Sequence, residues 1–194
     1  MRRHPPPLVL VLVLVLVLGL GLVSCTDGPA PAPPPPCDQK CKDGIGLRAM
    51  RETLKLAFNL TLQGKPVGTY DVSTPCPRGG TARIFGTATS NAVQGATEVK
   101  LTYEIANCAY VQKDDDEKEN YSITVSGTVT QEGTLAVQPS STTALLMKSD
   151  SITLTGSVYD PPDPYEAKEC PLDIFQNGNR VAGTMCGREV GFDF

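Results

Sequence analysis

The chain carries seven cysteines, the side chains whose type and spacing allow the most chemistry; they stand at positions 25, 37, 41, 76, 108, 170 and 186. Cys25 differs from the others because it directly follows an apolar run of 16 residues, Leu8 to Val23, which itself follows Arg2 and Arg3. The run is shorter than the ~20 residues that span a bilayer, and its order of basic, apolar and small residues is typical of a signal peptide. A spanning anchor and a plain secretory signal are the alternatives.

The residues just before the first cysteine, Leu22-Val23-Ser24-Cys25, resemble the lipobox of bacterial lipoproteins. The resemblance implies cleavage before Cys25 and a diacylglycerol on its thiol, so that lipid would hold the protein at a membrane. Thr26 suits outer-membrane sorting, so we expect a lipid-anchored protein of the bacterial cell envelope, with the outer membrane favoured over the inner. Residues 1–24 would then be the signal peptide, 25–36 the lipidated cysteine and a proline-rich tether, and 37–194 the folded domain.

The six remaining cysteines are an even number in an exported chain, which favours three disulfides. We predict the pairs Cys37–Cys41, Cys76–Cys108 and Cys170–Cys186, because the members of each pair lie close in sequence or flank adjoining predicted strands. A metal site is the alternative.

Cleavage would also remove His4, the only histidine. A domain without histidine can build neither a Ser-His-Asp nor a Cys-His site, and it lacks the commonest general base, so we expect neither an enzyme nor a cofactor. Arg2 and Arg3 leave with the signal, and the remaining 15 basic and 21 acidic residues give a net charge of −6. That acidity argues against nucleic acid as a partner.

Two acidic segments remain as candidates for chemistry. Asp114-Asp115-Asp116-Glu117-Lys118-Glu119 could hold calcium but lacks the alternating ligand spacing of a calcium loop, so a solvated hairpin loop is favoured. The segment from Asp160 to Glu166 also offers carboxylates, but its three prolines predict a rigid connector. A carboxylate-based hydrolase is therefore the least favoured function.

Two hydrophobic periods compete between residues 43 and 62. Leu47, Met50, Leu54 and Phe58 fit one face of a helix, and the good helix formers around them favour a helix over residues 46–59. Alternating apolar residues leave a strand over residues 53–62 as the other interpretation.

Beyond Cys76, alternation of apolar and polar side chains predicts an antiparallel sheet with one dry and one wet face. Strands are predicted at 82–89, 99–105, 121–130, 144–148, 151–159, 171–176 and 180–186, and Val190, Phe192 and Phe194 alternate like an edge strand. Asn177-Gly178 between two of them is a hairpin signal.

A weak repeat places Gly86, Gly127, Gly156 and Gly183 among the apolar positions of four strands. If the strands align these glycines, a shallow trough crosses the dry face. The helix could fill the trough, the glycines could let the sheet curl, or an apolar ligand could bind there.

Two short motifs, Cys76-Pro77-Arg78-Gly79-Gly80 and Asn107-Cys108, look like those of an uncharacterised set of exported bacterial lipoproteins with a cysteine-linked sheet. The resemblance covers about residues 64–130, supports the Cys76–Cys108 pair and implies no activity. The expected fold class is mainly β: a curled antiparallel sheet with one N-terminal helix packed on its apolar face and three disulfides.

The expected function is a non-enzymatic structural or protein-interaction module of the cell envelope. Its partners would be the membrane, through the lipid anchor, and envelope proteins that the sequence does not identify. A carrier of a lipid or small apolar ligand on the glycine-lined face is the alternative.

Overall fold

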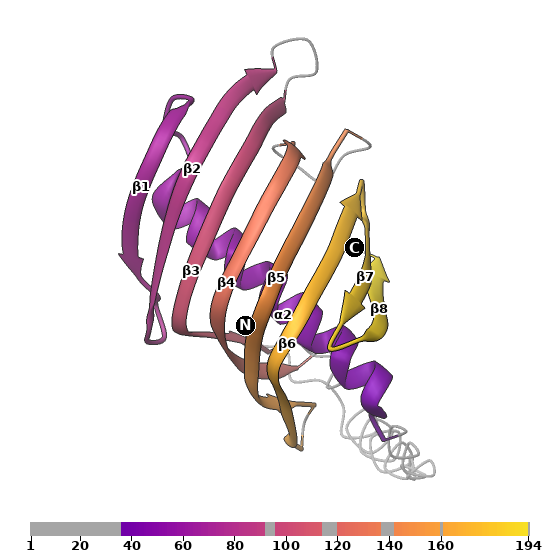
Figure 1. Cartoon of the computed structure of the whole chain (residues 1–194). Helices are drawn as coiled ribbons and strands as arrows, with labels where there is room; N and C mark the ends of the chain where they lie inside the picture. The colour runs from indigo at the N-terminus through magenta and orange to yellow at the C-terminus, as the bar shows by residue number, and fades with distance from the viewer. Residues whose placement is uncertain (1–35, 92–95, 114–119, 137–141, 160, 194) are drawn as a thin grey trace, which may run out of the picture. The chain divides into compact units, whose positions relative to one another are not determined.

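The computed structural model describes residues 36–91, 96–113, 120–136, 142–159 and 161–193, which form one helix and an eight-stranded antiparallel sheet (Figure 1). Consecutive strands are neighbours throughout, so that β1 and β8 are the two edges of the sheet. The predicted signal peptide, Cys25, the tether up to Pro35 and the acidic run 114–119 lie outside the described residues.

The helix α2 spans Gln39–Thr61, which confirms the predicted helix over 46–59 and shows that the strand interpretation of 53–62 was wrong. It begins seven residues earlier than predicted because Asp38 caps it, accepting a hydrogen bond from the backbone N–H of Cys41 at 2.9 Å. Gly46 lies inside the helix, and its missing side chain makes room for Tyr165, whose ring an added Cβ would meet at 2.7 Å.

The eight strands are β1 Gly68–Pro75, β2 Thr81–Asn91, β3 Ala96–Gln112, β4 Tyr121–Leu135, β5 Ala144–Val158, β6 Asp163–Asn177, β7 Arg180–Met185 and β8 Arg188–Asp193. The predicted segments 144–148 and 151–159 are one strand, β5, interrupted by irregular pairing between Ser149 and Ile152. The hairpin between β6 and β7 is present, but its two loop residues are Gly178 and Asn179, one position later than predicted.

The strand β1 was not predicted. Its side chains are half-buried or exposed in alternation, because it is an edge strand. The alternation of apolar residues in this segment is therefore too weak to predict a strand.

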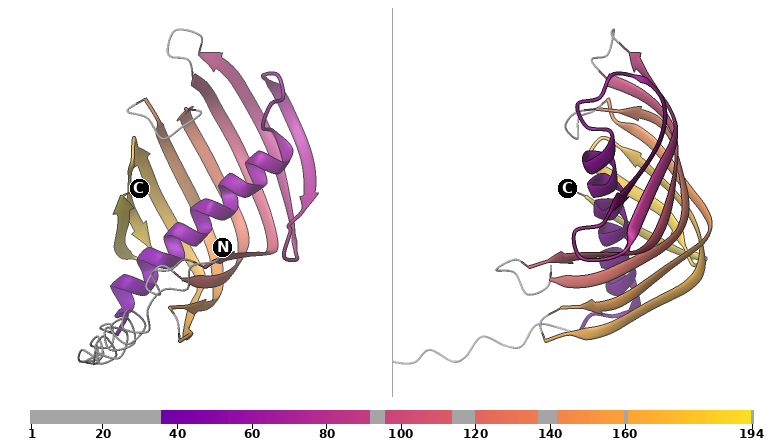
Figure 2. Two further views of the ribbon diagram at one scale, coloured as in Figure 1. Left: turned by 180° about the vertical axis from the view of Figure 1, so that it is seen from behind. Right: turned by 90° about the vertical axis from the view of Figure 1, so that its left-hand side faces the viewer.

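The sheet curves around α2, which runs obliquely across its concave face (Figure 2). The strands β3, β4 and β5 each contain a register shift, and the shift in β3 lies between Ile105 and Cys108. The three shifts are adjacent in the sheet, because Gly127 of β4 pairs with both Ile105 of β3 and Ile152 of β5. Adjacent bulges of this kind bend a sheet.

The four repeat glycines adopt positive φ angles of 133° to 151°. A Cβ on Gly156 would collide with the carbonyl oxygen of Ser122 on the neighbouring strand, so only glycine fits there. The register places Gly86 and Gly183 in one cross-strand row, whereas Gly127 and Gly156 lie in other rows. The four positions therefore do not line up as a continuous trough.

The core lies between α2 and the concave face. The helix buries Leu47, Met50 and Leu54 there, as the helical period predicted, whereas Phe58 is only half-buried. The sheet contributes the alternate side chains of every strand from β2 to β7, including Ile84, Leu101, Ile123, Met147, Ile174 and Met185. Burial of this apolar surface is the main favourable contribution to the free energy of folding.

Three disulfides cross-link the domain, with the predicted pairing: Cys37–Cys41, Cys76–Cys108 and Cys170–Cys186. The first joins the residue before the helix cap to the first turn of α2. The second ties the turn after β1 to β3, and the third ties β6 to the turn between β7 and β8.

Candidate functional site

A cavity of about 490 Å³ lies between the second half of α2 and the concave face of the sheet. Its apolar wall consists of Leu54, Phe58 and Leu62 from the helix and its end, Val67 before β1, and Tyr70, Ala88, Leu135, Leu145 and Met147 from the sheet. This volume falls within the roughly 300–1,000 Å³ of small-molecule sites, which are likewise mostly apolar with a few polar groups.

The cavity arises because the core is not filled at this end. Phe58 of α2 is half-buried, and Val67, in the segment between α2 and β1, is exposed, whereas Leu54 and Ala57 of the same half of the helix are buried. Val67, whose exposed fraction is 50 %, belongs to both the cavity wall and the molecular surface.

Four of the uncharged polar side chains that line the cavity are buried: Tyr103, Gln131, Thr143 and Gln176. The Tyr103 hydroxyl donates to Gln131 Oε1 at 2.6 Å, and both residues are buried. Gln176 Nε2 donates to the carbonyl oxygen of Gly178 at 3.0 Å, and Gln176 Oε1 accepts from Arg51 Nε at 3.4 Å. Burial raises the pKa of Tyr103 far above the usual value for a tyrosine, so this hydroxyl stays protonated.

The fourth polar group, the hydroxyl of Thr143, is 2 % exposed and has no hydrogen-bond partner among the described residues. The backbone of Thr143 is fixed, because its carbonyl oxygen accepts from the N–H of Gly178 at 2.8 Å. Most buried hydroxyls in folded proteins are paired. The hydroxyl oxygen itself has almost no accessible surface, so Thr143 contributes an unpaired polar group behind the cavity surface.

The charged side chains in the cavity lining are all basic: Arg51, Lys55 and Lys65. Arg51 Nη1 lies 2.6 Å from Glu52 Oε1, and Lys55 Nζ lies 3.6 Å from Glu52 Oε2. Lys55 and Lys65 are largely exposed. The polar groups deeper in the wall thus carry no net charge.

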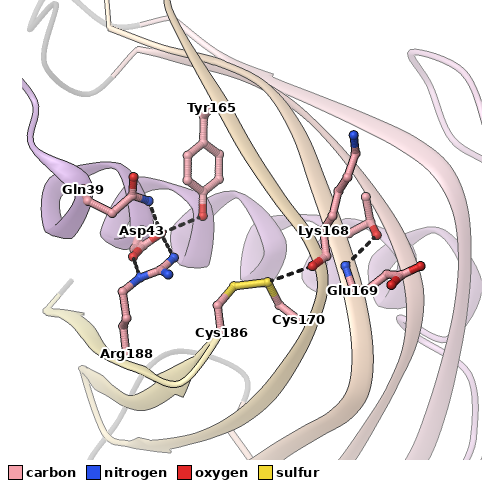
Figure 3. Close-up of a disulfide and its surroundings, with 9 residues drawn as sticks. Gln39, Asp43, Tyr165, Lys168, Glu169, Cys170, Cys186 and Arg188 are labelled. Atoms are coloured by element: carbon pink, nitrogen blue, oxygen red, sulfur yellow. Dashed lines mark hydrogen bonds and ion pairs between the residues drawn. A yellow bond between two sulfur atoms is a disulfide. The ribbon is translucent and has the colours of Figure 1, made fainter.

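A second polar cluster surrounds Asp43 in the first turns of α2 (Figure 3). The Asp43 carboxylate, 1 % exposed, accepts from Gln39 Nε2 at 2.9 Å and from the Tyr165 hydroxyl at 3.1 Å. Arg188 of β8 donates to both oxygens, with Nε at 2.6 Å and Nη2 at 3.0 Å. The Cys170–Cys186 disulfide lies nearby and holds the turn that leads into β8.

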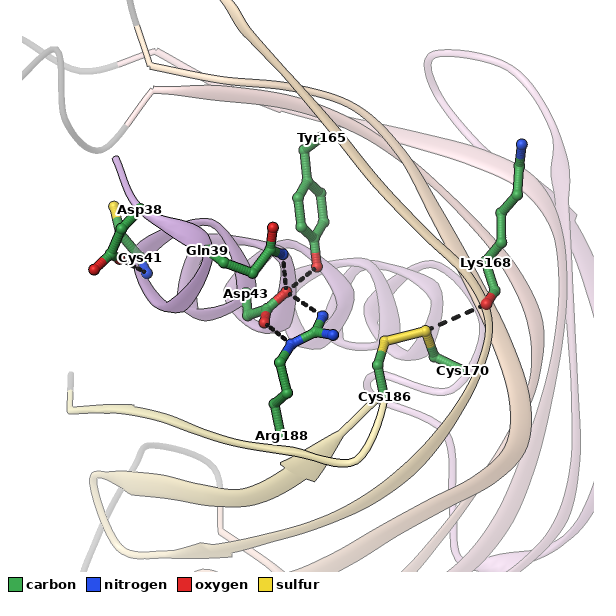
Figure 4. Close-up of polar contacts among 9 residues, drawn as sticks. All are labelled: Asp38, Gln39, Cys41, Asp43, Tyr165, Lys168, Cys170, Cys186 and Arg188. Atoms are coloured by element: carbon green, nitrogen blue, oxygen red, sulfur yellow. Dashed lines mark hydrogen bonds and ion pairs between the residues drawn. A yellow bond between two sulfur atoms is a disulfide. The ribbon is translucent and has the colours of Figure 1, made fainter. Parts of the chain in front are cut away.

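The Asp43 cluster is an anchor. Its hydrogen bonds join α2 to β6 and β8, and the Asp38 cap precedes it on the same helix end (Figure 4). Burial, together with the Asp43 charge, raises the pKa of Tyr165 far above its usual value. Because the carboxylate bonds to residues of both β6 and β8, the cluster fixes the helix start against the sheet.

The predicted site residues do not meet at the cavity. None of Gly86, Gly127, Gly156 and Gly183 lines it, and the six cysteines are all paired in disulfides. Cys25 lies outside the described residues. Within the described ranges, no group of three or more histidine, cysteine, aspartate or glutamate side chains could hold a metal ion.

The cavity residues did carry a signal that sequence reasoning missed. Three polar residues each stand two positions from a buried apolar residue, which places both on the same face of the sheet. The pairs are Gln131 with Val129, Thr143 with Leu145, and Gln176 with Ile174. Polar side chains on the dry face of three neighbouring strands indicate a polar pocket in the core.

Comparison with family models, with curated proteins and with solved structures gave no significant match. In the part of the chain that the structure describes, no helix is long and apolar enough to cross a membrane.

Proposed function

We propose that the protein is a lipid-anchored protein of the bacterial cell envelope that binds a small apolar molecule in the cavity between α2 and the sheet. The lipobox-like motif ending at Cys25 supports the anchor. The observation that carries the binding function is the cavity of about 490 Å³ with its apolar wall.

Binding is favoured over catalysis by the chemistry of the wall. Its inner polar groups are a tyrosine, two glutamines and a threonine, and no ionisable acid or base pair is aimed at a common point. The bound molecule would sit away from the glycine positions, towards the end of α2. Val67, half-exposed, would lie at the entrance.

A structural or protein-interaction module is the second candidate. The first half of α2 favours it, because Leu47 and Met50 are fully buried and Asp43 anchors the helix. That half of the dry face is covered by the protein itself.

The two candidates differ in what the purified protein carries. Wild-type protein extracted from membranes should release a non-covalently bound apolar molecule into organic solvent, identified by mass spectrometry. The delipidated protein should then bind an apolar fluorescent probe such as Nile red.

The Ala88→Phe variant tests the location of binding. Ala88 lines the cavity, so the added ring occupies it and should abolish probe binding. Thr87→Phe is the matched control, because Thr87 is the exposed neighbour on the same strand and the same ring is added outside the core. Both variants should remain folded by circular dichroism. Wild-type protein that carries no molecule and binds no probe would favour the structural module.

A further inference from the structure

We propose that the ligand of this cavity is a single-chain anionic amphiphile: one acyl chain that lies in the cavity and carries a carboxylate or phosphate head at the cavity mouth, beside Lys55 and Lys65. The inference rests on the proposed binding function and names the class of ligand. Three features of the cavity support it: the sign of its charge, the place of that charge and the volume inside.

The charge of the cavity lining is positive. Arg51, Lys55 and Lys65 belong to the lining, and no aspartate or glutamate among the described residues does. Glu52, which is not part of the lining, lies 2.6 Å from Arg51 Nη1 and 3.6 Å from Lys55 Nζ. One carboxylate thus serves two cations, and Lys65 has no ion pair with any described residue. The lining therefore keeps an excess of positive charge that an anionic group can balance.

This positive charge is local, in a protein that is acidic as a whole. The chain has 17 basic and 21 acidic residues, yet from Thr53 to Tyr70 the only charged residues are Lys55 and Lys65. This stretch contains the second half of α2 and the segment that leads to β1, and its side chains form one side of the cavity. A negatively charged head is therefore attracted to this side although the net charge of the protein is negative.

The two lysines lie where the cavity meets solvent. The Lys55 side chain is 55 % exposed, Lys65 is exposed, and the half-exposed Val67 belongs to the same lining. Leu54 and Met147 are buried parts of that lining. A charged head can thus stay hydrated beside the lysines while its chain lies against the apolar wall, so that no charge has to be buried.

The volume of the cavity matches one acyl chain. A methylene group takes up about as much space as a water molecule in the liquid, about 30 Å³, so the cavity of about 490 Å³ holds on the order of 16 such groups. A lipid with two chains of that length needs about twice the space. The volume therefore favours a single-chain amphiphile.

The experiment compares four probes of equal chain length, below the concentrations at which they form micelles, by displacement of Nile red from the delipidated protein. A fatty acid and an alkyl phosphate are anionic, the methyl ester of the acid is neutral, and an alkylamine is cationic. At neutral pH and low salt, at least one anionic probe should bind about three- to tenfold more tightly than the ester, because exposed ion pairs are individually weak. The amine should bind more weakly than the ester. The anionic preference should shrink at about 1 M salt, which screens charges beyond about 3 Å.

The two anionic probes distinguish the possible heads of the ligand. Tighter binding of the fatty acid identifies a carboxylate, and tighter binding of the alkyl phosphate identifies a phosphate. A preference of either probe over the ester supports the inference.

A double substitution assigns the preference to the lysines at the mouth. Lys55→Gln together with Lys65→Gln should lower the affinity for the anionic probe to that for the ester, while the affinity for the ester is retained. The matched control is Lys100→Gln together with Lys148→Gln, which removes the same charge from exposed positions on β3 and β5 outside the lining and should keep the preference. Unchanged ester binding in both proteins shows that the cavity is intact.

The inference is overturned if neither anionic probe binds more tightly than the ester, if the preference survives in the Lys55→Gln, Lys65→Gln protein, or if the control protein loses it equally. Tighter binding of a two-chain phosphatidylglycerol than of either anionic probe would also overturn it. In each of these cases, binding of the ester leaves the proposed binding function standing. If neither the probes nor Nile red bind, the proposed binding function fails, and the assignment of a ligand class fails with it.

Discussion

At the scale of residues, two of the buried tyrosines, Tyr103 and Tyr121, have hydroxyls with opposite bonding states. The Tyr103 hydroxyl donates to Gln131, whereas the Tyr121 hydroxyl has no hydrogen-bond partner in the described ranges. Tyr121 is 3 % exposed, and its ring stacks on Tyr110 with centroids 6.0 Å apart. Burial raises the pKa of both tyrosines well above the usual value, so each stays protonated at neutral pH.

Removing each hydroxyl should therefore have opposite effects on stability. Tyr121→Phe should leave the free energy of unfolding unchanged or raise it by about 1 kcal/mol, because the buried hydroxyl has no bond to lose. Tyr103→Phe should lower it by about 1–2 kcal/mol, since the Gln131 carbonyl oxygen loses its donor. Urea unfolding with the disulfides intact measures both changes. Equal losses in the two variants would show that Tyr121 is bonded in solution.

At the scale of elements, the two ends of α2 are held differently. The first turns are fixed by the Asp38 cap, the Cys37–Cys41 disulfide and the Asp43 cluster, while the last turns cover a cavity. The polar contacts that hold α2 are therefore concentrated at its start, while its second half contributes side chains to the cavity wall.

Among the polar contacts between α2 and the sheet, those of Asp43 should contribute most to the free energy of unfolding. Asp43→Ala should lower the free energy of unfolding by about 3 kcal/mol, because it leaves Tyr165 and Arg188 without their buried acceptor. Asp163→Ala is the matched control: Asp163 pairs with Lys42 of the same helix at 2.8 Å, but its side chain is 42 % exposed, and the loss should stay below about 1 kcal/mol. Similar small losses in both variants would mean that Asp43 is not an anchor.

The sheet contains glycines whose backbone conformation other residues rarely adopt. Gly156→Ala should lower the free energy of unfolding by about 2 kcal/mol or more, because of the positive φ and the collision with the Ser122 carbonyl. Gly68→Ala should change it by less than about 0.5 kcal/mol, since an added Cβ meets nothing within 4 Å at that edge position. Thermal unfolding of the pair measures the contrast. A Gly156→Ala protein as stable as Gly68→Ala would show that the sheet does not need this backbone geometry.

At the scale of the whole molecule, alternation and helical period predicted the sheet and the helix, since both are encoded in neighbouring residues. The disulfide pairs were predicted because the members of each pair lie close in sequence or flank adjoining predicted strands. Two features could not be read in this way. One is the edge strand β1, whose alternating pattern is weak. The other is the cavity, which depends on the cross-strand rows in which Gln131, Thr143 and Gln176 lie. Register across strands is set by bulges at Ile105 and Gly127, which local patterns do not show.

The proposed lipid anchor concerns the whole molecule, because it determines how far from the membrane the folded domain can bind a ligand. Eleven tether residues, Thr26 to Pro36, include six prolines, and an extended chain of this kind rises ~3.1 Å per residue. The start of the folded domain would therefore stay within roughly 35 Å of the lipid surface, and the cavity lies farther along the chain, beside the second half of α2.

Cys25→Ser should abolish both acylation and processing of the protein. The expected result is a precursor that is not cleaved by the lipoprotein signal peptidase and does not take up labelled palmitate, because the thiol that receives the diacylglycerol is absent. Cys37→Ser is the matched control: it removes another cysteine near the tether, one that the structure places in a disulfide, and it should leave labelling intact. Labelling that persists in Cys25→Ser, with an unchanged mature mass, would mean that the lipid is attached elsewhere and that the cavity is not tethered by residues 25–36.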